Sequence, residues 1–365
     1  MTDAGGAVGA GGAGNAGGAG DAAGAGGGRD TAGAAPRNYC DPAAEYTAAR
    51  EDVVIVRRTD RSFIRVHGRD PQRMVQGLVS NDVVNSPADR AVYATILTPK
   101  GKMVADTRIL RRDGELLLET AVGAADGMAA HLRKFVPPLF ARFEDATSAW
   151  SLFGVHGPRA ADLVRGAFGV EVAGSAEDVV HETSHEEVQV PVIATSTADV
   201  EGYDVLVPAA AAERVWQVLQ DAGARPIGYA TLDVLRIEAG TPVWGAELDE
   251  NTIPLEAGLR ARAISESKGC YTGQEVIIRI LHRGHVNWQL RGVLLGDAES
   301  PARGTALVRE ADGKQVGRVT SAAWSPKHGQ AIALAYVRRE VELPGALRLG
   351  DVSGREVTVV ELPFA

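Results

Sequence analysis

The feature that most constrains the fold is a short segment that occurs twice. Ser62–Gly68 and Ser151–Gly157 both read as strands, and both end in Val-His-Gly. An amphipathic helix is predicted after each of them, over Asp70–Val79 and over Pro158–Phe168. Asp70 is placed to cap the first helix, and the proline that follows it suits the first helical position. The repeat predicts an internal duplication of a strand–helix unit and therefore a fold of the α+β class.

Between the two copies the pattern is that of paired strands. Val92–Leu97 and Met103–Leu110 flank the sequence Thr-Pro-Lys-Gly-Lys, which is a strong turn signal. A further strand is expected at Leu116–Glu119, and a helix over Ala124–Phe135 ends before two prolines. This region therefore predicts an antiparallel sheet with helices on one face. Beyond the second copy we expect a strand at Tyr203–Val207 and two further helices, which end near Ala222 and at Ala239.

After about residue 286 the sequence changes to short strands separated by turns. The expected strands are Arg291–Leu295, Thr305–Arg309, Gln315–Thr320, Ala331–Val337 and Glu356–Glu361. Regular short strands with little helix predict a small β-barrel or sandwich. We therefore divide the chain into a Gly/Ala-rich tail (1–36), a main α+β region (37–287) and a C-terminal β-barrel domain (288–365). The tail has no apolar face to bury, so we predict that it is disordered and has no function of its own.

Composition limits the partners and the location of the protein. A net charge of −9 over 365 residues argues against a long nucleic acid as the main partner. The two cysteines, Cys40 and Cys270, form no CxxC pair, so the chain alone cannot supply four thiolates to an iron–sulfur cluster or a zinc ion. We expect a cytoplasmic protein without a membrane span, because cysteines are few and neither a signal peptide nor a long apolar stretch is present.

The most unusual local sequence is Lys268–Glu275, which reads KGCYTGQE. Its two glycines allow a ligand to approach the backbone closely, and a lysine two residues before a thiol favours the thiolate. Taken alone, however, a single cysteine such as Cys270 is more often an inert small apolar residue than a nucleophile. His282 and His285 follow, and a pair with this spacing suits either a metal site or, more commonly, a polar surface.

Lys268–Glu275 matches in full the signature of the YgfZ-type folate-binding proteins. That group includes mitochondrial iron–sulfur assembly factors and is related to the aminomethyltransferase of glycine cleavage. The similarity continues upstream in Arg236–Asp249 and Ile253–Leu259, and near the front in Gln76–Val83 and Leu97–Lys102. The chain thus resembles this group over all but its tail. The resemblance implies a tetrahydrofolate site in the central channel of a three-part fold, within the main α+β region.

The resemblance also assigns residues to the cofactor. Glu201 matches an acidic residue that relatives place on the pterin ring, and its alternative role is that of a solvated loop carboxylate. Arg236 matches an arginine that contacts folate, and its alternative role is that of an exposed helix cation. Lys268, Tyr271 and Gln274 of the cysteine loop are also expected to bind the cofactor.

Two residues are the predicted catalytic groups. Asp106 lies in the strand where aminomethyltransferases carry two adjacent aspartates and use the second in one-carbon transfer. Ala105 replaces the first aspartate here, so Asp106 is expected to contact folate while its catalytic role stays open. Aminomethyltransferases lack both Cys270 and Gln274 in the matching slot. A thiol beside a folate channel suits exchange of a one-carbon unit or contact with a cluster-carrying partner.

Three functions are consistent with the sequence. The first is a tetrahydrofolate-binding accessory factor for the assembly or repair of iron–sulfur enzymes, including those that modify tRNA. Its partners would be those enzymes or cluster-carrier proteins, without a membrane or direct nucleic-acid contact. The second is an aminomethyltransferase that acts with a lipoyl carrier protein. The third is a folate-responsive scaffold with no chemistry at Cys270.

Overall fold

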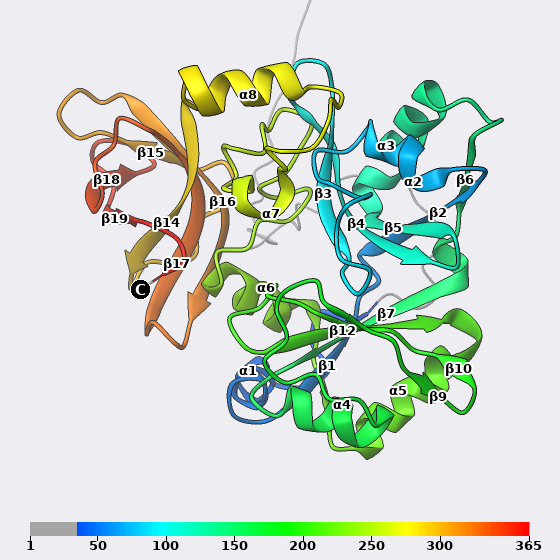
Figure 1. The fold of residues 1–365 in the computed structure, drawn as a ribbon. Helices are drawn as coiled ribbons and strands as arrows, with labels where there is room; N and C mark the ends of the chain where they lie inside the picture. Colours follow the sequence, from blue (N-terminus) through cyan, green and yellow to red (C-terminus); the bar gives the residue numbers. More distant parts are fainter. Residues whose placement is uncertain (1–34, 365) are drawn as a thin grey trace, which may run out of the picture. The chain divides into compact units, whose positions relative to one another are not determined.

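The computed structural model of the protein describes residues 35–364, which belong to one compact unit. The predicted disorder of the tail falls on residues that lie almost entirely outside the described part. Three β-structures organise the compact unit: a five-stranded sheet, a six-stranded sheet and a closed barrel (Figure 1). The predicted α+β class with antiparallel sheets and a C-terminal barrel is therefore confirmed. Within residues 35–364, no helix combines the length and apolar character that crossing a membrane requires.

The five-stranded sheet is antiparallel throughout. Its strand order is β3 (Val92–Leu97), β4 (Met103–Arg112), β5 (Glu115–Ala121), β2 (Arg61–Gly68) and β6 (Ala141–Asp145). Helices α2 (Pro71–Gln76) and α3 (Val122–Phe135) pack against it through one shared apolar core. Side chains alternate between the two faces of a strand, so every second residue of β4 faces away from that core. The expected sheet with helices on one face is confirmed.

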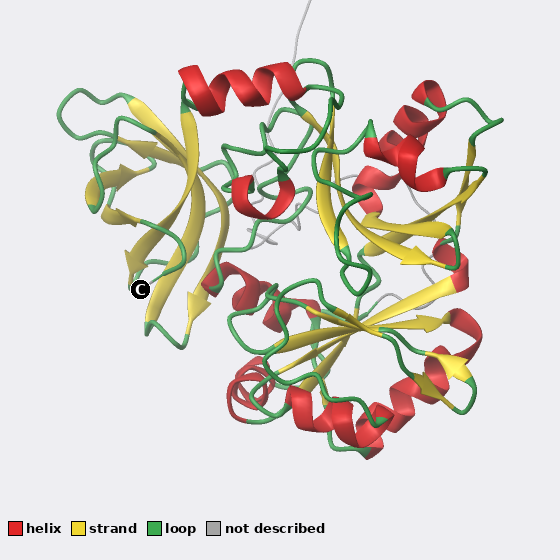
Figure 2. Ribbon diagram, viewed as in Figure 1, coloured by secondary structure: helices red, strands yellow, loops and turns green. Residues whose placement is uncertain are grey.

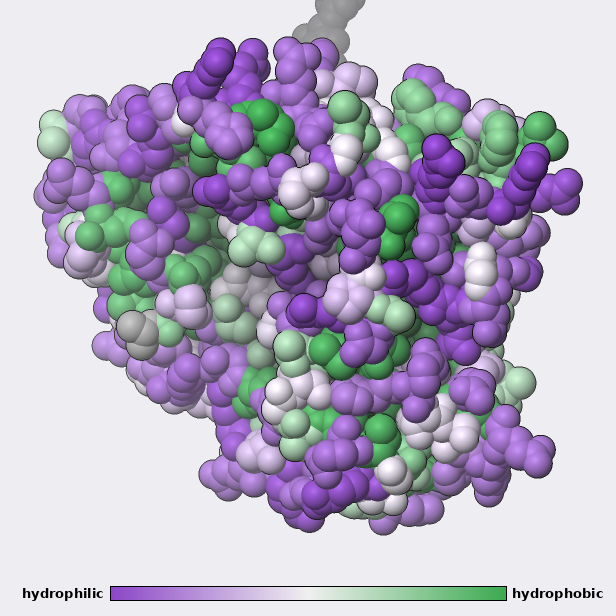
Figure 3. Space-filling model, in the orientation of Figure 1, coloured by the Kyte–Doolittle hydropathy of each residue, from purple (hydrophilic) through white to green (hydrophobic). Residues whose placement is uncertain are grey.

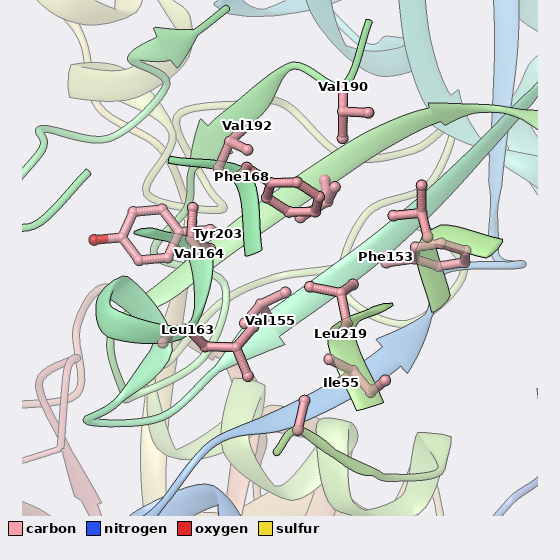
Figure 4. Packing of buried hydrophobic residues seen from close by; sticks show 14 of the residues in the cluster. Ile55, Phe153, Val155, Leu163, Val164, Phe168, Val190, Val192, Tyr203 and Leu219 are labelled. Carbon is pink, nitrogen blue, oxygen red and sulfur yellow. The ribbon is translucent and has the colours of Figure 1, made fainter. Parts of the chain in front are cut away.

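The six-stranded sheet is covered by helices on both faces. Its order is β13 (Arg225–Pro226), β1 (Val54–Arg57), β7 (Trp150–His156), β12 (Gly202–Pro208), β11 (Val192–Ala194) and β8 (Val180–His181). Helices α4 (Ala160–Phe168) and α5 (Ala212–Asp221) pack on one face, around the apolar cluster of Figure 4. Helices α1 (Pro42–Glu51) and α6 (Tyr229–Glu238) pack on the other. All pairings in this sheet are antiparallel except that of β1 with β13.

The repeated sequence forms the same structure in both sheets. Strand β2 leads into α2 and strand β7 leads into α4. A glycine with positive φ ends β2 (Gly68, 141°) and follows β7 directly (Gly157, 125°). A Cβ at these glycines would lie 2.7 Å from a carbonyl oxygen of Phe140 and 2.3 Å from one of Asp52. The glycines are therefore required by close backbone contacts as well as by their conformation. Asp70 caps α2 as expected, although the helix is shorter than predicted and ends at Gln76.

The C-terminal part closes into a barrel (Figure 2). Its strands follow the order β14 (Trp288–Gly296), β17 (Gln330–Arg338), β16 (Gln315–Ser325), β15 (Ala306–Val308), β18 (Gly345–Leu349) and β19 (Glu356–Val360). Closure removes the exposed strand edges that an open sheet of this size would present. The sequence predicted five of these strands and missed β18, because a strand of five residues between turns has only a weak alternating pattern.

Short elements complete the described chain. They are the helices α7 (Arg260–Ala263) and α8 (Gln274–Arg283), the 3₁₀ turns η1 (Thr147–Ala149) and η2 (Ala209–Ala211), and the hairpin of β9 (Ser184–His185) and β10 (Val188–Gln189). Gln274 is the first residue of α8.

A buried ionic cluster connects the five-stranded sheet to the six-stranded sheet. Arg108 of β4 donates from Nη2 to Asp204 Oδ2 of β12 at 2.7 Å and from Nε to Glu119 Oε2 of β5 at 2.8 Å. Arg58 lies 3.8 Å from the other oxygen of Asp204. Burial acts to raise the pKa of Asp204, but attraction by Arg108 and Arg58 lowers it overall. The carboxylate therefore stays charged although the residue is 2% exposed.

His156 lies beside this cluster at the end of β7. It is fully buried, and neither of its ring nitrogens has a hydrogen-bond partner in the described structure. The ring lies over two glycines of the sheet, because a Cβ at Gly154 or Gly202 would come within 2.7 Å or 2.5 Å of its nitrogens. Burial lowers the pKa of His156 to about 4, although Asp204 opposes the shift.

Replacing Arg108 by methionine should strongly destabilise the protein. The change leaves the Glu119 and Asp204 carboxylates buried with fewer counter-charges, which typically costs about 3–5 kcal/mol. Denaturant unfolding measures the loss. Arg65→Met is the matched control, since Arg65 pairs with Glu115 at the surface and should matter little. Equal effects of the two changes would contradict this account of the cluster.

The stability of the protein should depend on pH through His156. The unfolded chain takes up a proton near the ordinary pKa of 6.5, whereas the folded chain resists it down to about 4. Stability is therefore fully present above pH 6.5 and is lost as the pH falls through this window, by about 3 kcal/mol. Unfolding free energies of the wild type and of His156→Gln, measured across the window, should diverge by that amount. Parallel pH profiles would show that His156 does not titrate in this way.

Candidate functional site

A cavity of about 450 Å³, which we name the main cavity, is lined by residues of both sheets and of α6. Tyr93 and Asp106 reach it from β3 and β4, Asp204 from β12, and Arg236 from α6. Trp244, from the loop after α6, adds an apolar wall. The volume lies in the range of small-molecule sites, which are concave and mostly apolar with a few convergent polar groups.

Two aspartates that line this cavity each have one carboxylate oxygen without a hydrogen bond in the described structure. Asp106 Oδ2 accepts a hydrogen bond from the Tyr93 hydroxyl at 2.9 Å, and Asp204 Oδ2 accepts one from Arg108. The second oxygen of each aspartate is buried and has no hydrogen-bond partner in the described structure. Buried polar atoms usually have partners, so these two oxygens are unsatisfied acceptors on residues that line the cavity.

Tyr93 holds Asp106 in place. Burial, together with the negative charge of Asp106, raises the pKa of Tyr93 well above its ordinary value, so the hydroxyl keeps its proton and donates. The guanidinium of Arg262 lies over the Tyr93 ring, 4.0 Å from its centroid. Ala105, which precedes Asp106, is fully buried in the apolar core on the other face of β4. An aspartate at position 105 would therefore point away from the cavity.

Arg236 borders the cavity but is not an exposed helix cation. It is 4% exposed, and its guanidinium donates to Asp233 at 2.6 Å, to Glu247 at 2.9 Å and to Ser321 of the barrel strand β16 at 2.6 Å. All three guanidinium nitrogens are thus engaged within the protein. Arg236 joins α6 to the barrel, and its predicted contact with folate stays a prediction.

Glu201 lies away from the main cavity. Its carboxylate accepts a hydrogen bond from the Tyr203 hydroxyl at 2.6 Å, and it borders a separate, smaller recess. Asp204, three residues further on, is the acidic residue of this segment that faces the main cavity. Strand alternation would have indicated it, because Tyr203 and Val205 pack into the core under α4 and α5, so Asp204 faces the opposite side.

The cysteine loop also lies outside the main cavity, since none of Lys268, Cys270, Tyr271 and Gln274 lines it. The thiol of Cys270 is free and exposed. Tyr271 is buried, and its hydroxyl has no described hydrogen-bond partner. The Lys268 ammonium lies 5.2 Å from the centre of the Tyr271 ring. The sequence grouped these residues with the folate contacts because they share one motif, whereas the structure places them in a different region from Asp106 and Arg236.

Lys268 anchors this loop to the front of the chain. Its ammonium donates to the backbone carbonyls of Gln76, Val79 and Asn81. Burial lowers its pKa to about 8, while Asp82 opposes the shift. An ammonium has three donors, and all three are used. Lys268 therefore has a structural role at this position.

Three of the sequence segments that carry the resemblance, around residues 76, 98 and 270, converge at this loop. Thr272 N donates to the carbonyl of Gly77, in the first motif. Gly273 packs on the turn of the second motif, because a Cβ there would lie 2.6 Å from the carbonyl oxygen of Thr98. The motifs around residues 76, 98 and 270 thus form one folded surface from which Cys270 projects.

The described residues form no evident metal site. Among residues 35–364, no three or more His, Cys, Asp or Glu side chains are grouped as metal ligands would be. His282 and His285 are both exposed near the end of α8. Their alternative role as polar surface residues agrees with this position.

Comparison with known proteins identifies both parts of the chain. Residues 21–267 match the GCVT N-terminal domain, and residues 289–365 match the glycine cleavage T-protein C-terminal barrel domain. The aminomethyltransferase of Rubrobacter xylanophilus is 31% identical over 90% of this chain and 87% of its own length. That of Thermus thermophilus is 28% identical, over 90% of this chain and 92% of its own.

The fold agrees with a solved relative. The glycine cleavage system aminomethyltransferase T from Bartonella henselae matches 89% of both chains with a TM-score of 0.79, at 19% sequence identity. Members of this family bind tetrahydrofolate, in agreement with the predicted cofactor. All three of these relatives bear the name aminomethyltransferase, which confirms the broader part of the resemblance. The chain therefore belongs to the glycine cleavage T-protein, or aminomethyltransferase, family.

Proposed function

We propose that the main cavity binds tetrahydrofolate and that Asp106 and Asp204 receive its pterin ring. The observation that carries the proposal is the pair of buried carboxylate oxygens without partners. A reduced pterin offers an amino group and ring N–H groups, and hydrogen bonds from such donors to a carboxylate are charge-assisted and strong. Trp244 and Leu232 supply apolar walls that suit the aromatic spacer of the cofactor. When bound, the cofactor supplies ring nitrogens that carry one-carbon units.

We further propose that the protein serves iron–sulfur enzymes as an accessory factor. Support comes from the complete KGCYTGQE sequence and from Ala105, which together resemble the YgfZ-type group more than the aminomethyltransferases. The exposed position of Cys270 suits contact with a partner protein. Any cluster ligation would need donors from that partner, because the two cysteines of the chain cannot supply the four thiolates of a conventional cluster.

Aminomethyl transfer is the second candidate. The names of the curated relatives and the presence of Asp106 in the cavity favour it. The two candidates share the folate site and differ in what happens outside the cavity. Their tests must therefore measure both folate binding and the downstream reaction.

Calorimetry with tetrahydrofolate tests the proposed site. Asp204→Asn and Asp106→Asn should each weaken binding at least tenfold, about 1.4 kcal/mol, because each removes the charge of an acceptor. Glu201→Gln is the matched control and should bind like the wild type, since Glu201 lies in another recess. A loss of affinity in Glu201→Gln with normal binding by Asp204→Asn would reverse the assignment.

Cellular complementation and a transfer assay separate the two candidate functions. In a strain lacking the gene and under oxidative stress, the wild type and Cys40→Ser should restore iron–sulfur enzyme activity, whereas Cys270→Ser should not. Purified protein supplied with an aminomethyl-lipoyl donor and tetrahydrofolate should release no ammonia. Sustained release of ammonia with formation of methylenetetrahydrofolate would instead establish aminomethyl transfer. Full rescue by Cys270→Ser would remove the thiol from the mechanism.

A further inference from the structure

One corner of the five-stranded sheet exposes several large apolar side chains. Phe135, Leu139 and Phe140 are 42%, 78% and 37% exposed, and they surround the turn that follows α3. Two exposed prolines, Pro137 and Pro138, stiffen the turn. We name Phe135, Leu139 and Phe140 the apolar corner. Single exposed apolar residues are ordinary, but a group of this size in one turn indicates an interaction surface.

The turn is held firmly against the start of α2. The carbonyl of Phe140 accepts hydrogen bonds from the backbone N–H groups of Arg69 and Asp70, at 3.0 and 3.3 Å. Phe140 N in turn donates to the carbonyl of Pro137 at 3.0 Å. The apolar corner is therefore displayed on an ordered frame, which lowers the entropy that a partner would have to remove on binding.

Basic side chains surround the apolar corner. Arg69 precedes α2, and Arg73 lies within it. Arg133 and Lys134 lie in the last turn of α3, and Arg142 lies on β6 just after the turn. All five are exposed, and in the part of the chain that the structure describes none of them forms an ion pair. The chain as a whole carries a net charge of −9. Figure 3 shows hydrophilic and apolar side chains side by side over α3 and β6, at the upper right of the view.

Local stability explains only part of this arrangement. Cations in the last turn of a helix interact favourably with its dipole, which accounts for Arg133 and Lys134. It does not account for Arg69, Arg73 and Arg142, nor for the exposure of Leu139. Asp70 is committed to capping α2 through the N–H of Arg73, so it does not neutralise the group.

We infer that the apolar corner and its five cations form a docking surface for an acidic protein segment that carries large apolar side chains. Aromatic side chains and arginine are enriched at the centres of protein interfaces, and the charge of this corner is complementary to an acidic partner. The inference does not depend on what the main cavity binds, because none of these residues lines that cavity.

A lipid surface suits the corner less well. Helices that bind at a bilayer surface bury a continuous apolar face, but the apolar face of α3 is already used, since Ala124, Met128 and Leu132 pack in the core of the sheet. Self-association through this corner would bring five cations against five cations if it were two-fold symmetric. An acidic protein segment needs no continuous apolar face on α3, and its charge is opposite to that of the five cations.

A random peptide library displayed on phage, selected against the full-length protein, tests the inference. Enriched peptides should combine Asp or Glu with Leu, Ile, Phe or Trp. A synthetic enriched peptide should bind at least tenfold more weakly to Leu139→Asp and to Arg133→Glu/Lys134→Glu, and more weakly to the wild type at high salt. Val352→Asp is the matched control, because Val352 is 52% exposed in the barrel, and it should bind the peptide like the wild type.

Four results would overturn the inference. They are no enrichment, enrichment without acidic residues, equal binding by Leu139→Asp, and binding lost equally in Val352→Asp. If the wild type, but not Leu139→Asp, floats with vesicles of phosphatidylglycerol and phosphatidylcholine, the partner of the apolar corner is a membrane and not a protein. If the wild type self-associates and Leu139→Asp does not, the partner of the apolar corner is a second copy of the chain. An unchanged circular dichroism spectrum and an unchanged thermal unfolding midpoint of each variant confirm that its fold is intact.

Discussion

The ion pairs of Arg108 are the interaction on which the rest of the structure depends. This one guanidinium binds Glu119 within the five-stranded sheet and Asp204 of the six-stranded sheet. It therefore fixes the relation between the two halves of the duplicated fold at the point where the main cavity forms. Arg108 hydrogen-bonds to only one oxygen of Asp204. The other oxygen lies 3.8 Å from Arg58 and has no hydrogen-bond partner in the described structure, which supports its proposed contact with a ligand.

The cavity and the cysteine loop are separate regions of the folded chain. Asp106, Asp204 and Tyr93 belong to the cavity, whereas Cys270 is exposed on a surface built from three motifs that are distant in sequence. Lys268 holds that surface together through three backbone carbonyls. This arrangement suits a protein that binds a cofactor internally and meets a partner externally, and it explains why substitutions at the two regions should have different consequences.

Much of the fold could be predicted from the sequence, because its signals are local. Repeated Val-His-Gly turns, a capping aspartate and a Pro/Gly turn each act within a few residues. The site was harder to predict. Asp106 and Arg236 both line the main cavity, and their contact with folate stays a prediction. Glu201 lies at a separate recess, whereas Asp204, which was not among the predicted site residues, lines the cavity. Alternation along β12 separates Asp204 from its apolar neighbours on either side. Which of the two faces lines a cavity depends on how helices from elsewhere in the chain pack against the sheet. Likewise, the spacing of the cysteine motif does not show that all three donors of the Lys268 ammonium bind backbone carbonyls near residue 79.

A crystal structure of the protein with a stable reduced folate, such as 5-formyltetrahydrofolate, tests the central claim most directly. The account predicts electron density for the cofactor in the main cavity, with donors of the pterin ring hydrogen-bonded to the carboxylate oxygens of Asp204 and Asp106 that lack partners in the protein alone. Density in the recess beside Glu201, or at the cysteine loop with the main cavity filled only by water, would contradict it.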